Sequence, residues 1–357
     1  MKILSIVGAR PQFIKHAALF PELSEGYDNV LVHTGQHYDS ELSAVFFDEL
    51  EIPEPNYNLG IGSGTHAYQT GQMLMAIGDV LLKEKPQLVL VYGDTNSTLA
   101  GALAAAKLHI KLGHVEAGLR DFDKSMPEEI NRILTDHCSD LLFCPTQTSV
   151  SNLNREGITN GVYLTGDVMI DILLRDKEIA EKSNVLEALG LKSRQYLVVT
   201  IHRAGNTDNK ANLESIVDAL CRIDQTIIFP VHPRTEGALK KHGLYHKLEG
   251  SSQVRLIEPL GYIEFLKLMN HARKILTDSG GVQKEAYVLK VPCITLLEST
   301  GWVETVDDGW NVLVGTDTEK IVSMAREFEP KGEQKEVLGK GNASKNIKNI
   351  IDSVLKS

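Results

Sequence analysis

The sequence lacks an excess of basic residues and any long apolar run. It has 357 residues, with 37 Lys and Arg against 47 Asp and Glu and a formal net charge of −10. This balance argues against a general nucleic-acid binder, which needs a basic face to displace counterions, although a local basic pocket for a phosphate is still allowed. No run approaches the roughly 18 apolar residues of a membrane-spanning helix, so no membrane segment is expected. The first ten residues predict a strand rather than a signal peptide, and we expect a cytoplasmic protein.

The sequence is also poor in the patterns that hold metals and nicotinamide cofactors. The histidines show no H-x-x-E-H spacing, so no metal site is expected. The dinucleotide fingerprint G-x-G-x-x-G is absent, because the similar string at residues 60–64 follows no clear strand. Four scattered cysteines, none in a C-x-x-C pair, are expected to be buried and reduced rather than bridged or metal-bound: Cys138, Cys144, Cys221 and Cys293.

What the sequence does contain is a regular alternation of short apolar runs with longer amphipathic stretches. At about 150 residues per domain, the length suggests two domains. Short, nearly continuous apolar runs are typical of strands buried on both faces of a parallel sheet, and their alternation with helices predicts an α/β fold of βαβ units. In the first half, strands are expected over residues 2–7, 30–33, 88–91, 111–115, 141–144 and 162–164.

The same pattern restarts in the second half, with strands expected over residues 196–201, 227–231, 274–276 and 291–295. The polar, helical stretch 177–193 is the expected linker. We therefore predict two doubly wound, Rossmann-like domains that face each other across a cleft. Their expected bounds are 1–176 and 177–340, followed by an amphipathic C-terminal helix within 341–357.

Ligands of open α/β sheets bind outside the carboxyl ends of the strands, so the polar residues that follow strands are the candidates. Residues 8–12 follow the first strand and lead into a helix that contains Lys15. A helix N-terminus with Arg10 and Lys15 suits a phosphate or another anionic part of a substrate. The alternative is a solvated helix start.

Acidic residues follow the next two strands and open a further helix. Asp94 belongs to a cluster of five residues whose side chains favour helix N-caps, but capping one helix requires only one such residue. Glu116 follows an apolar strand directly, and Glu128 lies in a predicted first helical turn. For Glu128 the alternative is structural, because a carboxylate there complements the helix dipole and can pair with Arg132 four residues on.

In the second half, three strand ends carry histidines or a glycine turn. His202 and His232 each follow a strand, and a third strand leads into Ser279-Gly280-Gly281. Exposed backbone amides at a helix start suit a diphosphate, and Glu285 on the same helix could accept two ribose hydroxyls. A tight glycine turn without a ligand is the alternative.

Seven motifs occur in one order over about residues 8–290: GARPQ, GDTNST, HVEAGLR, PEEINR, HR-x-x-N, HPR and DSGGVQKEA. Together they resemble the non-hydrolysing UDP-N-acetylglucosamine 2-epimerase family. The resemblance implies a glycosyltransferase-B-like fold, a cytoplasmic homodimer without nicotinamide or metal, and a C-terminal helix that crosses back to the first domain. It also implies reversible inversion at C2 of a UDP-linked 2-acetamido sugar, which feeds N-acetylmannosamine-type units into polysaccharides.

The resemblance also implies residue roles. The positions that match the catalytic ones are Asp94, Glu116, Glu128 and His202. The positions that match nucleotide-holding ones, mostly in the second domain, are Arg10, Lys15, His232, Phe265, Ser279, Gly280, Gly281 and Glu285.

The C2–H bond of a pyranoside is not activated by a carbonyl, so direct deprotonation would be too slow. The family's reaction is elimination of UDP to a 2-acetamidoglucal, followed by re-addition of UDP to C1 with protonation on the other face of C2. Two faces need two proton-handling groups, and thus several carboxylates. His202 can stabilise the leaving diphosphate or relay a proton, and the amides of the Ser279 turn can stabilise the charge that builds on UDP.

The sequence departs from the family in places. Gly205 stands where many members have Glu, and Gly301-Trp302 replaces a Glu-Arg pair. Other strings, including WVETVDDGWN, resemble a branch that acts on UDP-2,3-diacetamido-2,3-dideoxy-glucuronate. Some bacterial members bind an activating UDP-sugar near the positions of Gln36 and His37, but Tyr38 departs from the basic residue usual there, so activation is not assumed.

Three other functions fit parts of this pattern. A retaining UDP-sugar glycosyltransferase shares the fold and nucleotide site but does not need the first-domain carboxylates. A hydrolysing epimerase shares the motifs and would release free N-acetylmannosamine and UDP. A non-catalytic sugar-nucleotide sensor would bind without turnover, which the intact carboxylates and His202 disfavour.

Overall fold

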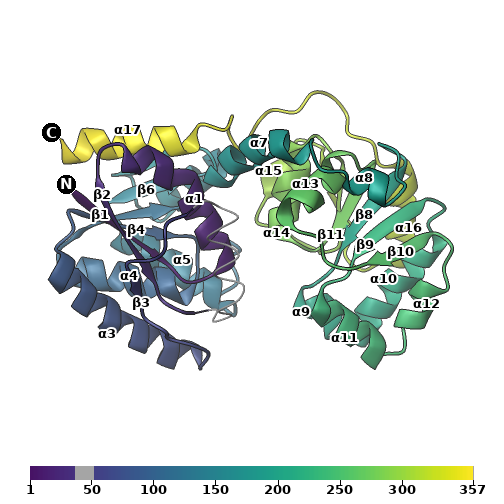
Figure 1. The fold of residues 1–357 in the computed structure, drawn as a ribbon, viewed down its shortest axis with the longest axis horizontal. Helices are drawn as coiled ribbons and strands as arrows, with labels where there is room; N and C mark the ends of the chain where they lie inside the picture. Colours follow the sequence, from purple (N-terminus) through teal and green to yellow (C-terminus); the bar gives the residue numbers. More distant parts are fainter. Residues whose placement is uncertain (37–51, 357) are drawn as a thin grey trace. The chain divides into compact units, whose positions relative to one another are not determined.

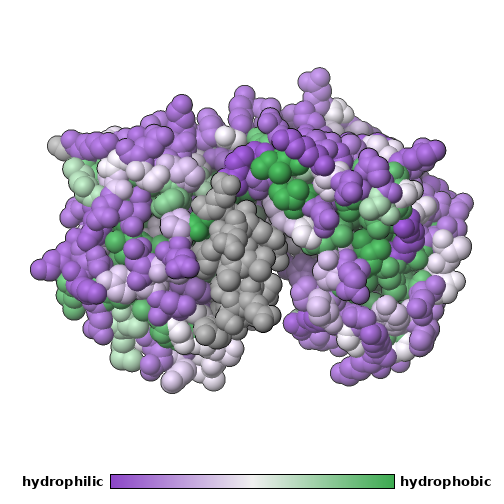
Figure 2. All heavy atoms as spheres, viewed as in Figure 1, coloured by the Kyte–Doolittle hydropathy of each residue, from purple (hydrophilic) through white to green (hydrophobic). Residues whose placement is uncertain are grey.

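The computed structural model describes residues 1–36 and 52–356 and divides into two compact α/β units (Figure 1). Unit 1 comprises Met1–Ile172 and Val337–Ser357, and unit 2 comprises Leu173–Glu336. Hydrophilic side chains cover most of the face of each unit seen in Figure 2. None of the described helices has the length and apolar character needed to span a bilayer.

Unit 1 is built on a parallel sheet. Among the described residues its strand order is β3-β2-β1-β4-β5-β6-β7. All five residues of β4, LVLVY, are buried, as expected for a strand covered on both faces. The strands are β1 (Lys2–Val7), β2 (Asp28–His33), β3 (Tyr57–Asn58), β4 (Leu88–Tyr92), β5 (Lys111–Val115), β6 (Leu141–Cys144) and β7 (Val162–Leu164).

The helices of unit 1 connect these strands. They are α1 (Arg10–Ser24), α3 (His66–Glu84), α4 (Asn96–Lys107), α5 (Pro127–Cys138), α6 (Gln147–Arg155) and α7 (Val168–Ala180), which continues into unit 2.

The last helix, α17 (Ala343–Leu355), returns to unit 1 and packs against α1. Its N-terminus is capped from α7, because Asp171 Oδ2 accepts a 2.7 Å hydrogen bond from the Ser344 amide. Near its other end the Tyr27 hydroxyl donates to Asp352 Oδ1 at 2.5 Å. The crossing-back helix that the resemblance implied is therefore present.

Unit 2 repeats the architecture with a parallel sheet of order β10-β9-β8-β11-β12-β13 among its described residues. Its strands are β8 (Tyr196–Thr200), β9 (Thr226–Pro230), β10 (Val254–Ile257), β11 (Lys274–Thr277), β12 (Cys293–Thr295) and β13 (Asn311–Leu313). Its helices are α8 (Val185–Ala188), α9 (Ala204–Thr207), α10 (Lys210–Arg222), α11 (Pro233–Lys241), α12 (Tyr245–Glu249), α13 (Tyr262–Asn270), α14 (Gly280–Val288), α15 (Val303–Asp307) and α16 (Thr318–Glu327).

The two units divide within α7, between residues 172 and 173, and again between residues 336 and 337. The stretch 177–193, expected as a linker, instead contributes to the interior of unit 2. Ala180, Val185 and Leu186 are buried there in one apolar cluster with Tyr196 of β8. The segment 177–193 therefore packs into unit 2 and does not form a linker between the two units.

In each sheet the strand order reverses at one place, between β1 and β4 in unit 1 and between β8 and β11 in unit 2. At such a reversal the connecting chains leave in opposite directions and open a crevice at the carboxyl ends of the strands. The chain therefore has two sites at which a ligand is expected, one in each unit.

Candidate active site

The β1–α1 turn of unit 1 is closed by its own side chains. Gln12 Oε1 accepts hydrogen bonds from the amides of Gly8 (2.8 Å) and Ala9 (3.0 Å), and its Nε2 donates to the Tyr92 carbonyl at 2.7 Å. A Cβ at Gly8 would lie 2.2 Å from the hydroxyls of Ser97 and Thr34. The turn therefore needs glycine for close approach. The amides of Gly8 and Ala9 are already bonded and are not offered to an anion.

Beside this turn, Lys15 and Glu116 form a buried ion pair. Lys15 Nζ lies 2.6 Å from Glu116 Oε1, and the two side chains are only 7% and 10% exposed. The pair lies against Gly93, since a Cβ there would be 3.0 Å from Lys15 Nζ and 3.7 Å from Glu116 Oε1. Glu116 has a φ of +74°, a left-handed conformation that costs a non-glycine residue energy and is most often found at functional sites.

Asp94 is held from helix α5. Arg132 donates from Nη2 (2.6 Å) and Nε (3.0 Å) to Asp94 Oδ2, and from Nη1 to Asp121 Oδ2 at 2.5 Å. The amide of Asn131 donates to the Asp94 carbonyl at 2.9 Å. Burial alone would lower the pKa of Arg132, but Asp94 and Asp121 outweigh it and keep this pKa above its ordinary value. Arg132 therefore stays charged and holds Asp94 in place.

Glu128 lies in the first turn of α5 and is exposed. The i, i+4 pair with Arg132, considered from spacing, does not form, because that guanidinium is engaged by Asp94, Asp121 and Glu129. Among the residues that the structure describes, Glu128 makes no ion pair. Of the two structural reasons for a carboxylate at position 128, only the favourable interaction with the helix dipole is left.

In unit 2 one buried carboxylate organises the reversal point. Asp278 follows β11 and is fully buried. Its oxygens accept hydrogen bonds from the amides of His202 (3.0 and 3.2 Å) and Arg203 (3.1 Å) and from Asn206 Nδ2 (3.0 Å). Asp278 belongs to the DSGGVQKEA motif, but its place in that motif does not predict this role.

The two predicted histidines of unit 2 lie near each other. The rings of His202 and His232 have centroids 6.2 Å apart, and His202 Nδ1 is 3.6 Å from Asp278 Oδ1. The imidazole of His232 caps α11, because its Nδ1 accepts a hydrogen bond from the Arg234 amide at 3.2 Å. This bond requires the proton of a neutral His232 ring to lie on Nε2.

The glycine turn opens helix α14. Ser279 is its N-cap, with Oγ 3.4 Å from the amide of Val282. A Cβ at Gly280 would lie 3.4 Å from Trp302 Nε1 and 3.9 Å from Arg203 Nη2. The Ser279 amide already donates to Thr277 Oγ1 at 2.9 Å. The first amides of a helix have no partner within it, so Gly280 and Gly281 can offer their N–H groups to a diphosphate.

Trp302 lies beside this turn and is 8% exposed. The ammonium of Lys284 lies 4.2 Å from the centroid of its ring. At Gly205, the other departure from the family pattern, an added Cβ would meet nothing within 4 Å.

The remaining candidates lie on helices. Glu285 is partly buried on α14, one and a half turns after the glycine turn, and Phe265 of α13 packs against the core of unit 2. Arg10 is the first residue of α1, but its side chain is outside what the structure describes.

His37 and Tyr38 also lie outside the described residues. Gln36 Oε1 accepts from the hydroxyl and amide of Ser97, at 2.7 and 3.0 Å.

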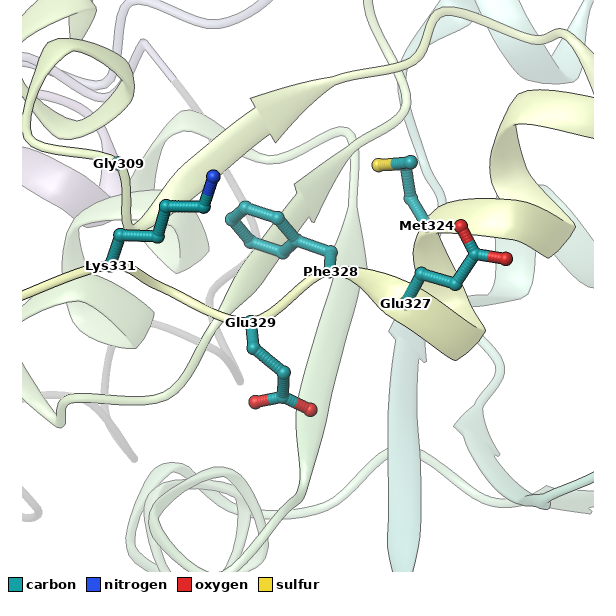
Figure 3. A pocket seen from close by; sticks show the side chains of 6 residues that line it. All are labelled: Gly309, Met324, Glu327, Phe328, Glu329 and Lys331. Atoms are coloured by element: carbon teal, nitrogen blue, oxygen red, sulfur yellow. The ribbon is translucent and has the colours of Figure 1, made fainter.

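Other features of the described chain do not add to these sites. Residues 1–36 and 52–356 contain no group of three or more His, Cys, Asp or Glu side chains arranged for a metal. A hollow in unit 2 lies at the end of α16, where the Phe328 ring lies between Met324 and Lys331 (Figure 3). Lys274, at the amino end of β11, donates to the Ala325 carbonyl nearby. This hollow is therefore at the opposite end of the strand from the glycine turn.

A family model described as UDP-N-acetylglucosamine 2-epimerase matches residues 22–352. The chain is 56% identical over 354 residues to a UDP-N-acetylglucosamine 2-epimerase homolog of Methanococcus maripaludis, covering 98% of this chain and 99% of the relative. It is 49% identical over 335 residues, 91% and 92% of the two chains, to the UDP-2,3-diacetamido-2,3-dideoxy-D-glucuronate 2-epimerase of Pseudomonas aeruginosa.

A solved structure supports the same relationship. The crystal structure of the Methanocaldococcus jannaschii UDP-GlcNAc 2-epimerase, in complex with UDP-GlcNAc and UDP, is similar with a TM-score of 0.89. The two chains are 47% identical, and the match covers 99% of this chain and 100% of the other. The α/β fold predicted from the sequence is confirmed, and the chain belongs to the UDP-N-acetylglucosamine 2-epimerase family.

Proposed function

We propose that this chain is an isomerase that interconverts UDP-N-acetylglucosamine and UDP-N-acetylmannosamine. A base removes the proton from C2 while the C1–O bond breaks, which leaves a C1–C2 double bond in a 2-acetamidoglucal and releases UDP. UDP then adds back to C1 while a proton is delivered to the opposite face of C2. The cycle consumes no oxidant, reductant or water.

The observation that carries this proposal is the pair of anchored carboxylates in unit 1. Glu116 is fixed by Lys15, and Asp94 by Arg132, at the strand reversal where a ligand is expected. Proton transfer to and from carbon needs groups held at defined positions, and each positioned acid or base contributes roughly 10²–10⁴-fold in rate. Asp94, Glu116 and Glu128 are proposed to handle the protons on the two faces of C2.

Unit 2 is proposed to bind UDP and to stabilise it as it leaves. The amides of the Ser279-Gly280-Gly281 turn would bind the diphosphate, and Glu285 the ribose hydroxyls. His202 would stabilise the charge on the diphosphate or pass it a proton. His232, Phe265, Arg10 and Lys15 complete the set of residues that the family resemblance assigns to substrate.

The direct test is the reaction in heavy water, followed by NMR, with purified protein and UDP-N-acetylglucosamine. The expected product is UDP-N-acetylmannosamine with deuterium at C2. An unlabelled product would indicate hydride transfer instead, and free N-acetylmannosamine would indicate a hydrolysing enzyme. Release of UDP only when an acceptor sugar is added would indicate a glycosyltransferase. Any of these three results would contradict the proposal.

The alternative substrate for the same chemistry is UDP-2,3-diacetamido-2,3-dideoxy-glucuronate. The identity to the relative that carries this name, 49%, is close to the 47% identity to the M. jannaschii UDP-GlcNAc 2-epimerase. Trp302, beside the glycine turn, stands where other members have a charged side chain. Offering both nucleotide sugars side by side and comparing kcat/KM distinguishes the two substrates.

We also propose, from the family resemblance, that the chain acts as a cytoplasmic homodimer. Helix α3 offers a face for a second copy. Tyr68, Met75 and Leu82 are about 60% exposed and recur every seven residues, which aligns them along one side of the helix. Light scattering of the wild type and of Met75→Glu checks this: a dimer that the variant dissociates supports this face, and a dimer unaffected by the variant places the interface elsewhere.

A further inference from the structure

A row of four charged side chains lies beneath the candidate carboxylates of unit 1. His114 of β5 is 2.7 Å from Asp136 of α5, and the other oxygen of Asp136 is 2.7 Å from Arg120. Arg120 in turn makes a two-pronged pair with Glu156, both bonds being 2.7 Å. The side chains of His114, Asp136 and Arg120 are at most 1% exposed. None of the four was singled out from the sequence.

Both nitrogens of the His114 ring face atoms that can only accept hydrogen bonds. Nδ1 lies 2.7 Å from Asp136 Oδ1, and Nε2 lies 2.7 Å from the carbonyl oxygen of Gly93. Asp136 Oδ2 accepts hydrogen bonds from Arg120 at 2.7 Å and from the Gly118 amide at 3.1 Å. The contact with a guanidinium favours the ionised carboxylate, which has no proton to donate to His114. A carbonyl oxygen never donates, so the two contacts are both satisfied only if both ring nitrogens carry protons.

The charges around the ring support this state. His114 and Arg120 as cations balance Asp136 and Glu156 as anions, so the row of four is neutral as a whole. Glu156, its partly exposed end, also lies 3.4 Å from His137 Nε2. Burial alone would raise the pKa of Asp136, but His114 and Arg120 outweigh it and leave it lowered. Cys144 of β6 is also close, but burial raises its pKa and keeps it a neutral thiol.

Gly93 connects this row to the candidate site. Its carbonyl accepts from His114, while the position of its missing Cβ faces Lys15 Nζ at 3.0 Å and Glu116 Oε1 at 3.7 Å. Its φ of +62° is left-handed, and its amide donates to the Val115 carbonyl at 3.0 Å. The next residue is Asp94. A shift of the Gly93 peptide would therefore move the surface under Glu116 and the attachment of Asp94 together.

We propose that His114 is a doubly protonated positioning residue, whose imidazolium holds the Gly93 carbonyl and thereby fixes the placement of Glu116 and Asp94 for proton transfer at C2. The expected effect on kcat rests on the proposed function, whereas the protonation state of the ring does not. Placement errors near 1 Å can cost about 10²-fold in rate, so the expected effect is in kcat.

The first test is the nitrogen NMR spectrum of wild-type protein labelled with ¹⁵N in histidine only. We expect one ring with two protonated nitrogens at about pH 7.5, above the ordinary histidine pKa. The signal is assigned by its loss in His114→Gln or, should that variant not fold, by its hydrogen bond to the Gly93 carbonyl. A neutral tautomer for His114 at this pH would overturn the proposal, whatever the enzyme's activity.

The second test compares His114→Gln with Glu156→Gln. Both change the charge of the same row, but only the first removes the bond to Gly93. For His114→Gln we expect kcat to fall about 10²-fold, with KM and the affinity for UDP within about threefold of wild type. For Glu156→Gln we expect a similar loss of thermal stability and a kcat within about threefold of wild type. Equal loss of kcat in the two variants would make the row merely structural and would overturn the positioning role.

The outcomes separate the inference from the function on which it rests. If the wild type epimerises neither nucleotide sugar, the proposed function fails, while the NMR experiment still decides the state of His114. If the wild type is active and His114→Gln retains its kcat, the positioning role fails and the proposed function stands.

Discussion

The two strand reversals of this chain use charge in opposite ways. In unit 1, carboxylates are matched with full cations, Glu116 with Lys15 and Asp94 with Arg132. In unit 2, the buried carboxylate of Asp278 accepts from neutral donors, namely two backbone amides and Asn206. Matched pairs can hold several acids close together, which suits proton transfer. A helix start with glycine amides, such as those of Gly280 and Gly281, suits an anion that must bind and leave.

The largest expected effect is at Glu116. The Glu116→Gln variant loses the carboxylate but keeps its shape, so we expect epimerisation to fall by about 10³-fold or more while UDP affinity stays within about threefold. Glu84→Gln is a matched control, because Glu84 pairs with Lys2 at 2.7 Å at the amino end of the same sheet. Deuterium exchange at C2 and titration calorimetry with UDP measure the two quantities. An active Glu116→Gln enzyme would contradict the assignment of proton transfer to unit 1.

The second effect tests unit 2. A side chain at Gly280 would crowd Trp302 and Arg203 at the start of α14, so Gly280→Val is expected to weaken UDP binding by about 30-fold, or ~2 kcal/mol. The control is Gly237→Val on α11, where an added Cβ meets nothing within 4 Å. The two variants share the cost of placing valine in a helix. Equal UDP affinity in both would move the diphosphate site away from this turn.

The third prediction concerns acid. Burial lowers the pKa of His16, in unit 1, to about 3. Below its ordinary pKa of about 6.5, the unfolded chain binds a proton that the folded chain does not, so stability falls as the pH drops from 6.5 toward 3. At pH 5 the loss is about 2 kcal/mol. Unit 2 has no fully buried histidine among its described residues.

His16→Asn removes this titration and should reduce the difference in the free energy of unfolding between pH 7.5 and pH 5 by about 2 kcal/mol. Circular dichroism in urea follows the whole chain, whereas tryptophan fluorescence follows unit 2, because Trp302 and Trp310 both belong to it. The same pH dependence in the variant and the wild type would exclude His16 as the cause.

The smallest effect is expected at Gly205, in a position of unit 2 that tolerates a side chain. Gly205→Glu restores the residue that many family members carry and should raise the free energy of unfolding by about 0.5 kcal/mol, because glycine is a poor helix residue. UDP affinity should not change. A large change in UDP binding, measured by calorimetry, would show that this position belongs to the nucleotide site after all.

The central strands of both sheets were predictable because they are buried on both faces, which leaves a continuous apolar run. Three edge strands, β3, β10 and β13, were not predicted, since they are short and only partly buried. The edge strand β7 is just as short and exposed but was predicted, because its three residues VYL are all apolar or aromatic. The end of β4 and the glycine turn after β11 were also predictable, because a polar cluster after a buried strand marks the edge where ligands bind.

The partners of the candidate residues were not predictable. Arg132 follows Asp94 by 38 residues, and Asp278 follows His202 by 76. Spacing on one helix suggested Glu128 as the partner of Arg132, but the tertiary fold supplies Asp94 and Asp121 instead. The left-handed backbone of Glu116 and the buried position of His114 depend equally on distant contacts, which a local sequence pattern does not encode.

The return of α17 to unit 1 has a consequence for biosynthesis. The polypeptide that builds unit 1 is interrupted by all of unit 2, so its last helix is translated only after the whole of unit 2. Unit 2 is contiguous, whereas unit 1 must wait, with the surface of α1 uncovered, for its final segment. A chain cut short before α17 would thus have its incomplete unit in the N-terminal half.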